Sequence, residues 1–149
     1  MHLHSPMDPL PIVEMLLDRG ADATEALAHA VWAARWDLAE LALDRGADPD
    51  HATANGKPLL NDLIRWGQIP RVMWMLEHRA SPNIQDADGW TAVHQAASRG
   101  NARVLQAVLD AGGDLRRRDK EGRTPVGIAR KAGREKLVTM MLDRERAGR

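Results

Sequence analysis

The stretch "DGWTAVHQAASRGNARVLQAVLDAGGD", Asp88–Asp114, returns later in the chain in altered form. A shift of 33 positions places it on "EGRTPVGIARKAGREKLVTMMLDRER", Glu121–Arg146, and brings glycine onto glycine at two points in each copy. The same shift toward the N-terminus reaches "NGKPLLNDLIRWGQIPRVMWMLEHRAS", Asn55–Ser81. A fixed period of this length indicates an array of similar structural units.

Each copy has the same internal order. A glycine-containing turn comes first, and a short apolar helix follows, which a second glycine such as Gly100 breaks. The next helix carries apolar residues at helical spacing, for example Val104, Leu105, Val108 and Leu109. One such helix pair cannot bury its apolar face alone, whereas stacked pairs can. The period therefore predicts a mainly helical solenoid.

The motifs within the period identify a family. Thr91–Ala97 reads "TAVHQAA" and Thr124–Val126 reads "TPV", close to the T-P-L-H-x-A-A motif of ankyrin repeats. Gly20–Asp22 and Gly46–Asp48 match the family's G-A-D ending. The chain thus resembles the ankyrin repeat family from residue 9 to about residue 146. The resemblance implies a solenoid of helix-turn-helix units with short β-hairpins.

The spacing predicts one domain over residues 1–149 with about 4.5 units, of which the first is a truncated cap. The first hairpin is expected to be missing, because Gly46 follows Gly20 too closely to leave room for one. Thr24 should then cap the following helix directly, and hairpins should occur only around Asn55, Asp88 and Glu121. The predicted units are about 1–22, 23–48, 49–81, 82–114 and 115–149.

His94 occupies a position to which the family assigns a structural role. The resemblance implies that its ring bonds to the backbone of adjacent turns, with help from Thr91. Asn61 falls at the same place one period earlier and could do likewise, whereas Gly127, one period later, cannot. We therefore predict no catalytic role for His94.

The sequence shows no recognisable motif for catalysis or for a cofactor. The chain has no cysteine, and it contains neither a phosphate-binding glycine loop nor an H-E-x-x-H motif. His2 and His4 lack an evident third zinc ligand, and no serine is placed for a nucleophilic triad. We predict a chain without enzymatic activity, metal or cofactor. No apolar run is long enough to cross a membrane and no secretory leader is apparent, so a cytoplasmic protein without membrane contact is expected.

Tryptophan and arginine often supply most of the affinity of a protein interface. Trp32 and Trp66 fall near the ends of first helices and Trp90 falls beside a hairpin glycine, so the three could line one concave surface. In the alternative, a tryptophan at the hairpin tip packs on the neighbouring turn. Trp74 is expected in the core and Trp36 half-buried at the start of a second helix.

Basic residues also recur with the period. Residues 1–111 contain 9 Lys/Arg and 15 Asp/Glu, whereas residues 112–149 contain 12 and 6. The predicted basic stripe combines first-helix ends with hairpin positions: Arg65, Arg99, Lys131, Lys57, Arg123 and Arg116–Arg118. One interpretation is a surface that attracts a protein partner with an acidic patch. The other is an ordinary solvated face.

The resemblance implies a protein-binding module with no chemistry of its own. Since nearly the whole chain consists of repeats, binding would be its entire function, and a stand-alone inhibitor or immunity protein that occludes its target would fit. A scaffold or adaptor that uses two faces separately is an alternative. A nucleic-acid-associated regulator is a weaker one, because the net charge is zero and stacking aromatics are not patterned as in single-strand binders. The free chain is expected to be monomeric.

Overall fold

The structure is a computed structural model that describes Met15, residues 23–50 and residues 57–147. These residues belong to two compact units, residues 1–51 and 52–149, and each unit is described by itself. Most of the predicted first repeat lies outside the described residues. The histidines His2 and His4 and the hairpin expected around Asn55 lie outside them too. A single domain over the whole chain stays a prediction.

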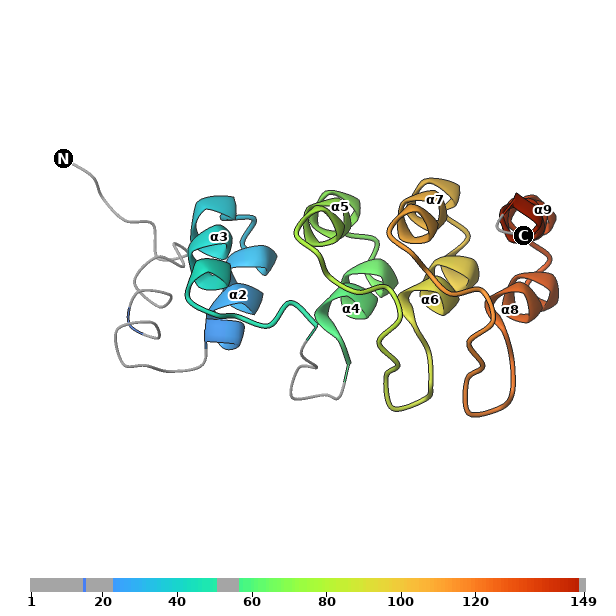
Figure 1. The fold of residues 1–149 in the computed structure, drawn as a ribbon, viewed down its shortest axis with the longest axis horizontal. Coiled ribbons are helices and arrows are strands. Elements are labelled where there is room, and N and C mark those ends of the chain that lie inside the picture. The colour runs from blue at the N-terminus through green and yellow to red at the C-terminus, as the bar shows by residue number, and fades with distance from the viewer. Residues whose placement is uncertain (1–14, 16–22, 51–56, 148–149) are drawn as a thin grey trace. The chain divides into compact units, whose positions relative to one another are not determined.

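The first unit contains α2 (Ala23–Trp32) and α3 (Trp36–Asp44), which pack against each other (Figure 1). Four of the seven buried residues of this pair are alanine, and such small side chains let two short helices approach closely. Trp36 begins α3 and is half-buried, as predicted. The buried residues of this pair are Ala26, Leu27, Ala30, Val31, Leu38, Ala39 and Ala42.

The start of α2 confirms one expectation and corrects another. Residues Ala23–Ala26 are helical, so no hairpin stands between Asp22 and Ala26. The prediction that Thr24 caps this helix is wrong, because α2 already includes Ala23 and Thr24 therefore lies inside the first turn. The Thr24 hydroxyl instead accepts a hydrogen bond from the Asp48 backbone N–H at 2.9 Å. It ties the start of α2 to the segment that follows α3.

The second unit consists of three helix pairs: α4 (Leu59–Arg65) with α5 (Ile69–Glu77), α6 (Ala92–Arg99) with α7 (Ala102–Asp110), and α8 (Pro125–Lys131) with α9 (Glu135–Ala147). The first helices of the pairs form one layer and the second helices form another (Figure 1). Their apolar faces meet in a continuous core that includes Leu63, Met75, Val93, Leu105 and Met141. Trp74 is also buried there, as predicted.

Local sequence signals fix the ends of these helices. The Thr91 and Thr124 side chains accept hydrogen bonds from backbone N–H groups at the starts of α6 and α8, which satisfies donors that have no partner within the helix. Gly100 ends α6 with φ = 78°, a left-handed conformation that glycine adopts without a steric cost. His78 follows α5, and its Nδ1 donates to the Trp74 carbonyl at 2.8 Å, which gives that helix-end carbonyl a partner.

The predicted hairpins at Asp88 and Glu121 are hairpin-shaped loops. Backbone hydrogen bonds of 2.9 Å close them, from Asp86 N–H to the Trp90 carbonyl and from Asp119 N–H to the Arg123 carbonyl. Residues 82–91 and 115–124 nevertheless contain no strand, since too few cross-loop bonds form to make a ladder. A bond of 3.0 Å from Lys120 N–H to the Asp88 carbonyl joins the two loops.

Candidate binding surface

His94 joins the second and third helix pairs of the unit from inside. Its side chain is 0% exposed. Nε2 lies 3.0 Å from the Arg123 carbonyl and Nδ1 lies 3.1 Å from the Thr91 backbone nitrogen, so the neutral ring donates to the first and accepts from the second. Burial lowers the pKa of the imidazole below 6.5, which favours this neutral form. The structural role expected of His94 is confirmed.

Asn61 makes the corresponding link between the first and second helix pairs. Its Nδ2 donates to the Trp90 carbonyl at 3.0 Å and also lies 3.4 Å from the Ile84 carbonyl. The amide oxygen is buried and has no hydrogen-bond partner. Because an unsatisfied buried acceptor is costly, Asn61 serves this position less well than His94 does.

Trp90 packs on the next hairpin loop. Its Nε1 donates to Asp119 Oδ2 at 3.0 Å, and the Arg123 Nε donates to the same oxygen at 2.9 Å. Burial opposes ionisation of Asp119, but hydrogen bonds from Arg123, Trp90 and Glu121 outweigh it and lower the pKa of this carboxyl. The half-buried indole thus holds two repeats together. A role for Trp90 in partner binding stays a prediction.

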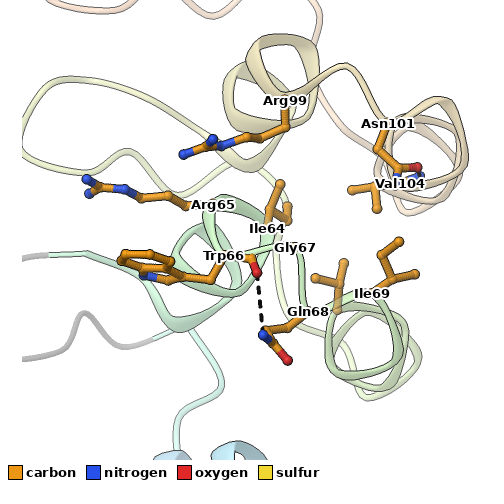
Figure 2. Close-up of a pocket in the computed structure, with 10 residues that line it drawn as sticks. Ile64, Arg65, Trp66, Gly67, Gln68, Ile69, Arg99, Asn101 and Val104 are labelled. Carbon is orange, nitrogen blue, oxygen red and sulfur yellow. Dashed lines mark hydrogen bonds between the residues drawn. The ribbon is translucent and has the colours of Figure 1, made fainter.

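Cationic and aromatic side chains gather where the first helices end. Arg65, Arg99 and Lys131 are the last residues of α4, α6 and α8, and all three are exposed. Trp66 follows Arg65 and is 62% exposed. We call these four residues the helix-end surface. Figure 2 shows Arg65, Trp66 and Arg99 extending toward the same side.

The charges of this surface are not neutralised locally. The Arg65 guanidinium lies 5.6 Å from the centre of the Trp66 ring, a distance at which a cation is attracted to an aromatic face. Neither Arg65 nor Arg99 pairs with a carboxylate in residues 23–50 or 57–147. Both guanidinium groups therefore remain available to an anionic group from outside the described chain.

A pocket of about 310 Å³ opens beside these side chains, between the α4–α5 turn and the α6–α7 turn (Figure 2). Both aliphatic and polar residues line it, and half-buried Gln68 and Asn101 contribute polar atoms. Asn101 turns inward to cap α7, where its Oδ1 accepts from Val104 N–H at 3.0 Å. The apolar lining comprises Ile64, Ile69, Val72 and Val104.

The other predicted binding residues belong to different parts of the chain. Trp90 precedes α6 and so sits at the opposite end of that helix from Arg99. Trp32 ends α2 in the other compact unit and is 38% exposed. Lys57 is half-buried just before α4. Within the second unit, the structure thus gathers Arg65, Trp66 and Arg99 around one pocket, and the other predicted residues of that unit do not line it.

The hairpin cations differ from the helix-end cations because many of them have carboxylate partners. Arg123 lies 2.9 Å from Asp119 and 3.3 Å from Glu121. Arg117 lies 3.4 Å from Asp114, and Arg116 lies 3.9 Å from Glu145. Such pairing weakens the field that a partner would meet at the hairpin loops.

Sequence reasoning missed the pocket and the feature that leaves it open. The residue after the turn glycine differs in each pair: Gln68, Asn101 and Arg134. Arg134 reaches back over the preceding turn, and its Nε donates to the Ser98 carbonyl at 3.1 Å. Asn101 is shorter and caps its own helix, so it leaves the space beside Gly67 open. The chain shifted by 33 positions against itself already shows this difference in sequence, but it does not show the direction of a side chain.

Two further properties concern only the described residues. Within residues 23–50 and 57–147, no three histidine or acidic side chains are grouped so that they could hold a metal ion. No helix in this part of the chain is long and apolar enough to cross a membrane.

Comparison with known proteins defines the class. A family model described as ankyrin repeats in three copies matches residues 52–148. Its span covers the helix pairs and hairpin loops of the second unit. The chain belongs to the ankyrin-repeat family, and its repeats are a protein–protein interaction fold.

Similar segments occur in larger proteins of diverse kinds. The chain is 45% identical over 67 residues to the inactive serine/threonine-protein kinase TEX14 of Bos taurus, which covers 45% of this chain and 4% of that protein. It is 36% identical over 90 residues to human diacylglycerol kinase iota, covering 58% and 8%. It is 35% identical over 65 residues to ankyrin repeat-containing protein P1E11.10 of Schizosaccharomyces pombe, covering 44% and 31%. The chain therefore spans less than a third of each relative.

Proposed function

We propose that this chain binds an acidic protein partner through its helix-end surface and acts by binding alone. The observation that supports the proposal is the pair Arg65 and Arg99, two exposed guanidinium groups without a carboxylate partner in the described residues, beside an exposed Trp66. Arginine and tryptophan are the side chains most often found at the energetic centre of protein interfaces. Lys131 would extend the positive field along the next repeat.

The proposed biological role is that of an inhibitor or immunity protein that covers the working surface of its target. A rigid repeat array suits occlusion, because little conformational entropy is lost when a preorganised surface binds. A scaffold would instead hold two proteins at once. We further propose that the free chain is a cytoplasmic monomer. The cationic residues of the hairpin loops, Lys57 and Arg123 among them, and the indoles of Trp32 and Trp90 would be accessory contacts.

Affinity capture from native lysate of the source cells tests the binding proposal. The wild-type chain is compared with Arg65→Glu/Arg99→Glu, which reverses both unpaired charges. The matched control is Arg103→Glu/Lys136→Glu, which makes the same change of net charge at exposed positions on the second helices α7 and α9. We expect one stoichiometric protein to be captured by the wild type and the control and to be lost with the helix-end variant.

The results separate the alternatives. A partner whose activity falls on binding supports the inhibitor role, several partners support a scaffold, and loss of capture on nuclease treatment supports a nucleic-acid-associated regulator. Equal capture by the wild type and Arg65→Glu/Arg99→Glu would contradict the proposed surface. Mutation of the helix-end arginines should mainly slow association and should matter less at high salt, because the contribution is electrostatic.

A further inference from the structure

The pocket next to Arg65 and Arg99 combines aliphatic side chains with two cationic groups. Four aliphatic side chains, Ile64, Ile69, Val72 and Val104, form one part of its lining. Two arginines that have no carboxylate partner in residues 23–50 or 57–147 stand at its edge, and the exposed Trp66 ring lies beside them (Figure 2). A volume of about 310 Å³ is at the low end for small-molecule sites and suits one or two amino-acid side chains.

At the next turn along the array, around Gly100, the position that corresponds to this pocket is covered by a side chain. The guanidinium of Arg134 lies over Gly100, so close that a Cβ added there would be 2.4 Å from one of its nitrogens. At Gly67, the equivalent glycine, a Cβ would meet nothing within 4 Å. The chain therefore covers one of these two positions with its own side chain and leaves the other uncovered.

We infer that the pocket receives a single apolar side chain from an acidic segment of the protein partner. The apolar side chain would enter between the two turns and pack against Trp66, while flanking carboxylates would meet Arg65 and Arg99. Charge complementarity identifies the occupant, because a neutral or basic segment would leave both guanidinium groups without a counter-charge at the interface. This inference rests on the proposed function and specifies the chemistry that its helix-end surface recognises.

Specificity would come from both parts of the site. Carboxylates alone would bind weakly and lose affinity with salt, since exposed ion pairs contribute little. The apolar side chain adds a contribution that salt does not screen, because it removes apolar surface from water. An acidic segment that lacks the apolar residue should therefore bind at least about tenfold more weakly than one that carries it.

The test uses a displayed library of random 12-residue peptides, selected separately on the wild-type chain and on Ile69→Trp. Ile69 is half-buried at the start of α5 and lines the pocket, so a larger tryptophan there is expected to occupy pocket space while both arginines stay in place. Peptides enriched on the wild type should share one apolar residue within two positions of Asp or Glu. Replacement of that residue by serine should weaken binding about tenfold, and Ile69→Trp should weaken it to a similar extent.

A second variant guards against an effect of misfolding. Asn101→Arg places at the open turn the residue that covers the closed one, and Asn101→Ala removes the same helix cap without adding a guanidinium. Thermal unfolding of each variant confirms that it is folded at the temperature of the binding assay. We expect Asn101→Arg to lose the preference for the apolar residue and Asn101→Ala to keep it.

The outcomes distinguish this inference from the proposed function. The pocket inference is wrong in any of three cases. The enriched peptides are acidic but share no apolar position, or they bind Ile69→Trp as well as the wild type, or the selection enriches no peptide. The helix-end surface would still stand in the first two cases if Arg65→Glu/Arg99→Glu abolished both peptide binding and capture of the partner. If that variant captured the partner normally, the proposed function would fail as well.

Discussion

The turns at Gly67 and Gly100 share a backbone and differ in what covers them. Both glycines are left-handed, with φ of 70° and 78°, and each stands between a first and a second helix. Arg134 lies over Gly100 and donates to the Ser98 carbonyl, whereas the space at Gly67 adjoins an open pocket. A repeated backbone conformation therefore does not give a repeated surface. In these two turns, the side chain contributed by the next repeat, Asn101 or Arg134, determines whether the turn is left open or covered.

The polar links inside the array differ in a parallel way. His94 satisfies both ring nitrogens between the second and third pairs, but Asn61 leaves its buried oxygen without a partner between the first and second pairs. His94→Ala should lower the free energy of unfolding by about 1–3 kcal/mol, because the Arg123 carbonyl and Thr91 N–H lose their partner. Asn61→Ala should cost less, since it also removes an unsatisfied atom. Urea denaturation of both variants measures the difference, and an equal or larger cost at Asn61 would contradict it.

Alanine substitution at the two turn glycines separates backbone strain from coverage. Gly67→Ala should cost about 1–2 kcal/mol through the left-handed conformation alone. Gly100→Ala should cost more, because its Cβ would displace the Arg134 guanidinium from the Ser98 carbonyl. In an Arg134→Ala background the two substitutions should become equal. A difference that persists in that background, measured by thermal unfolding, would show that Arg134 is not the cause.

The pH dependence of stability provides a third comparison. Burial lowers the pKa of folded His94 below 6.5, so the unfolded chain takes up a proton at this residue first as the pH falls. The free energy of unfolding should therefore decrease from about pH 6.5 downward, until the pH has passed the folded pKa. His94→Asn, which copies the residue of the preceding repeat, should flatten this decrease. Denaturation of both proteins at several pH values tests the sign, and parallel curves would exclude a contribution from His94.

Fluorescence quenching compares Trp66 and Trp90, two of the three tryptophans for which partner binding was predicted. Trp66 is 62% exposed, whereas Trp90 is half-buried and donates its indole N–H to Asp119. Acrylamide should quench Trp66 readily. The variant Trp66→Phe should therefore reduce the overall quenching constant, and Trp90→Phe should leave it unchanged or raise it. The opposite ranking would place Trp66 in the interior and remove it from the proposed surface.

Much of the fold could be predicted from sequence because it depends on residues that recur. The 33-residue period located the helix pairs, and the Thr91–Ala97 motif indicated the links of His94 and its cap. Thr24 was wrongly predicted to be the helix cap. The first residue of a helix depends on local backbone conformation, and the glycine spacing did not fix it to one residue. A truncated spacing still correctly excluded a hairpin over Ala23–Ala26.

The candidate site could be predicted only in part. The helix-end positions of Arg65, Arg99 and Lys131 followed from the period. The pocket did not, because it depends on Asn101 bending inward to cap α7 while Arg134 extends across a turn. The loop contacts of Trp90 were only an alternative at the level of sequence, since a hydrogen bond to Asp119 joins residues almost one repeat apart.

Selective observation of the indole groups tests the central claim most directly. The chain has five tryptophans, and ¹⁵N-labelling of this residue type gives one indole signal for each, assigned by single Trp→Phe variants. The partner captured from lysate is then titrated into the labelled chain. Binding at the helix-end surface predicts that the Trp66 signal shifts or broadens more strongly than the Trp90 signal. A strong change at Trp90 with Trp66 unaffected would place the partner on the hairpin loops and contradict the proposed surface.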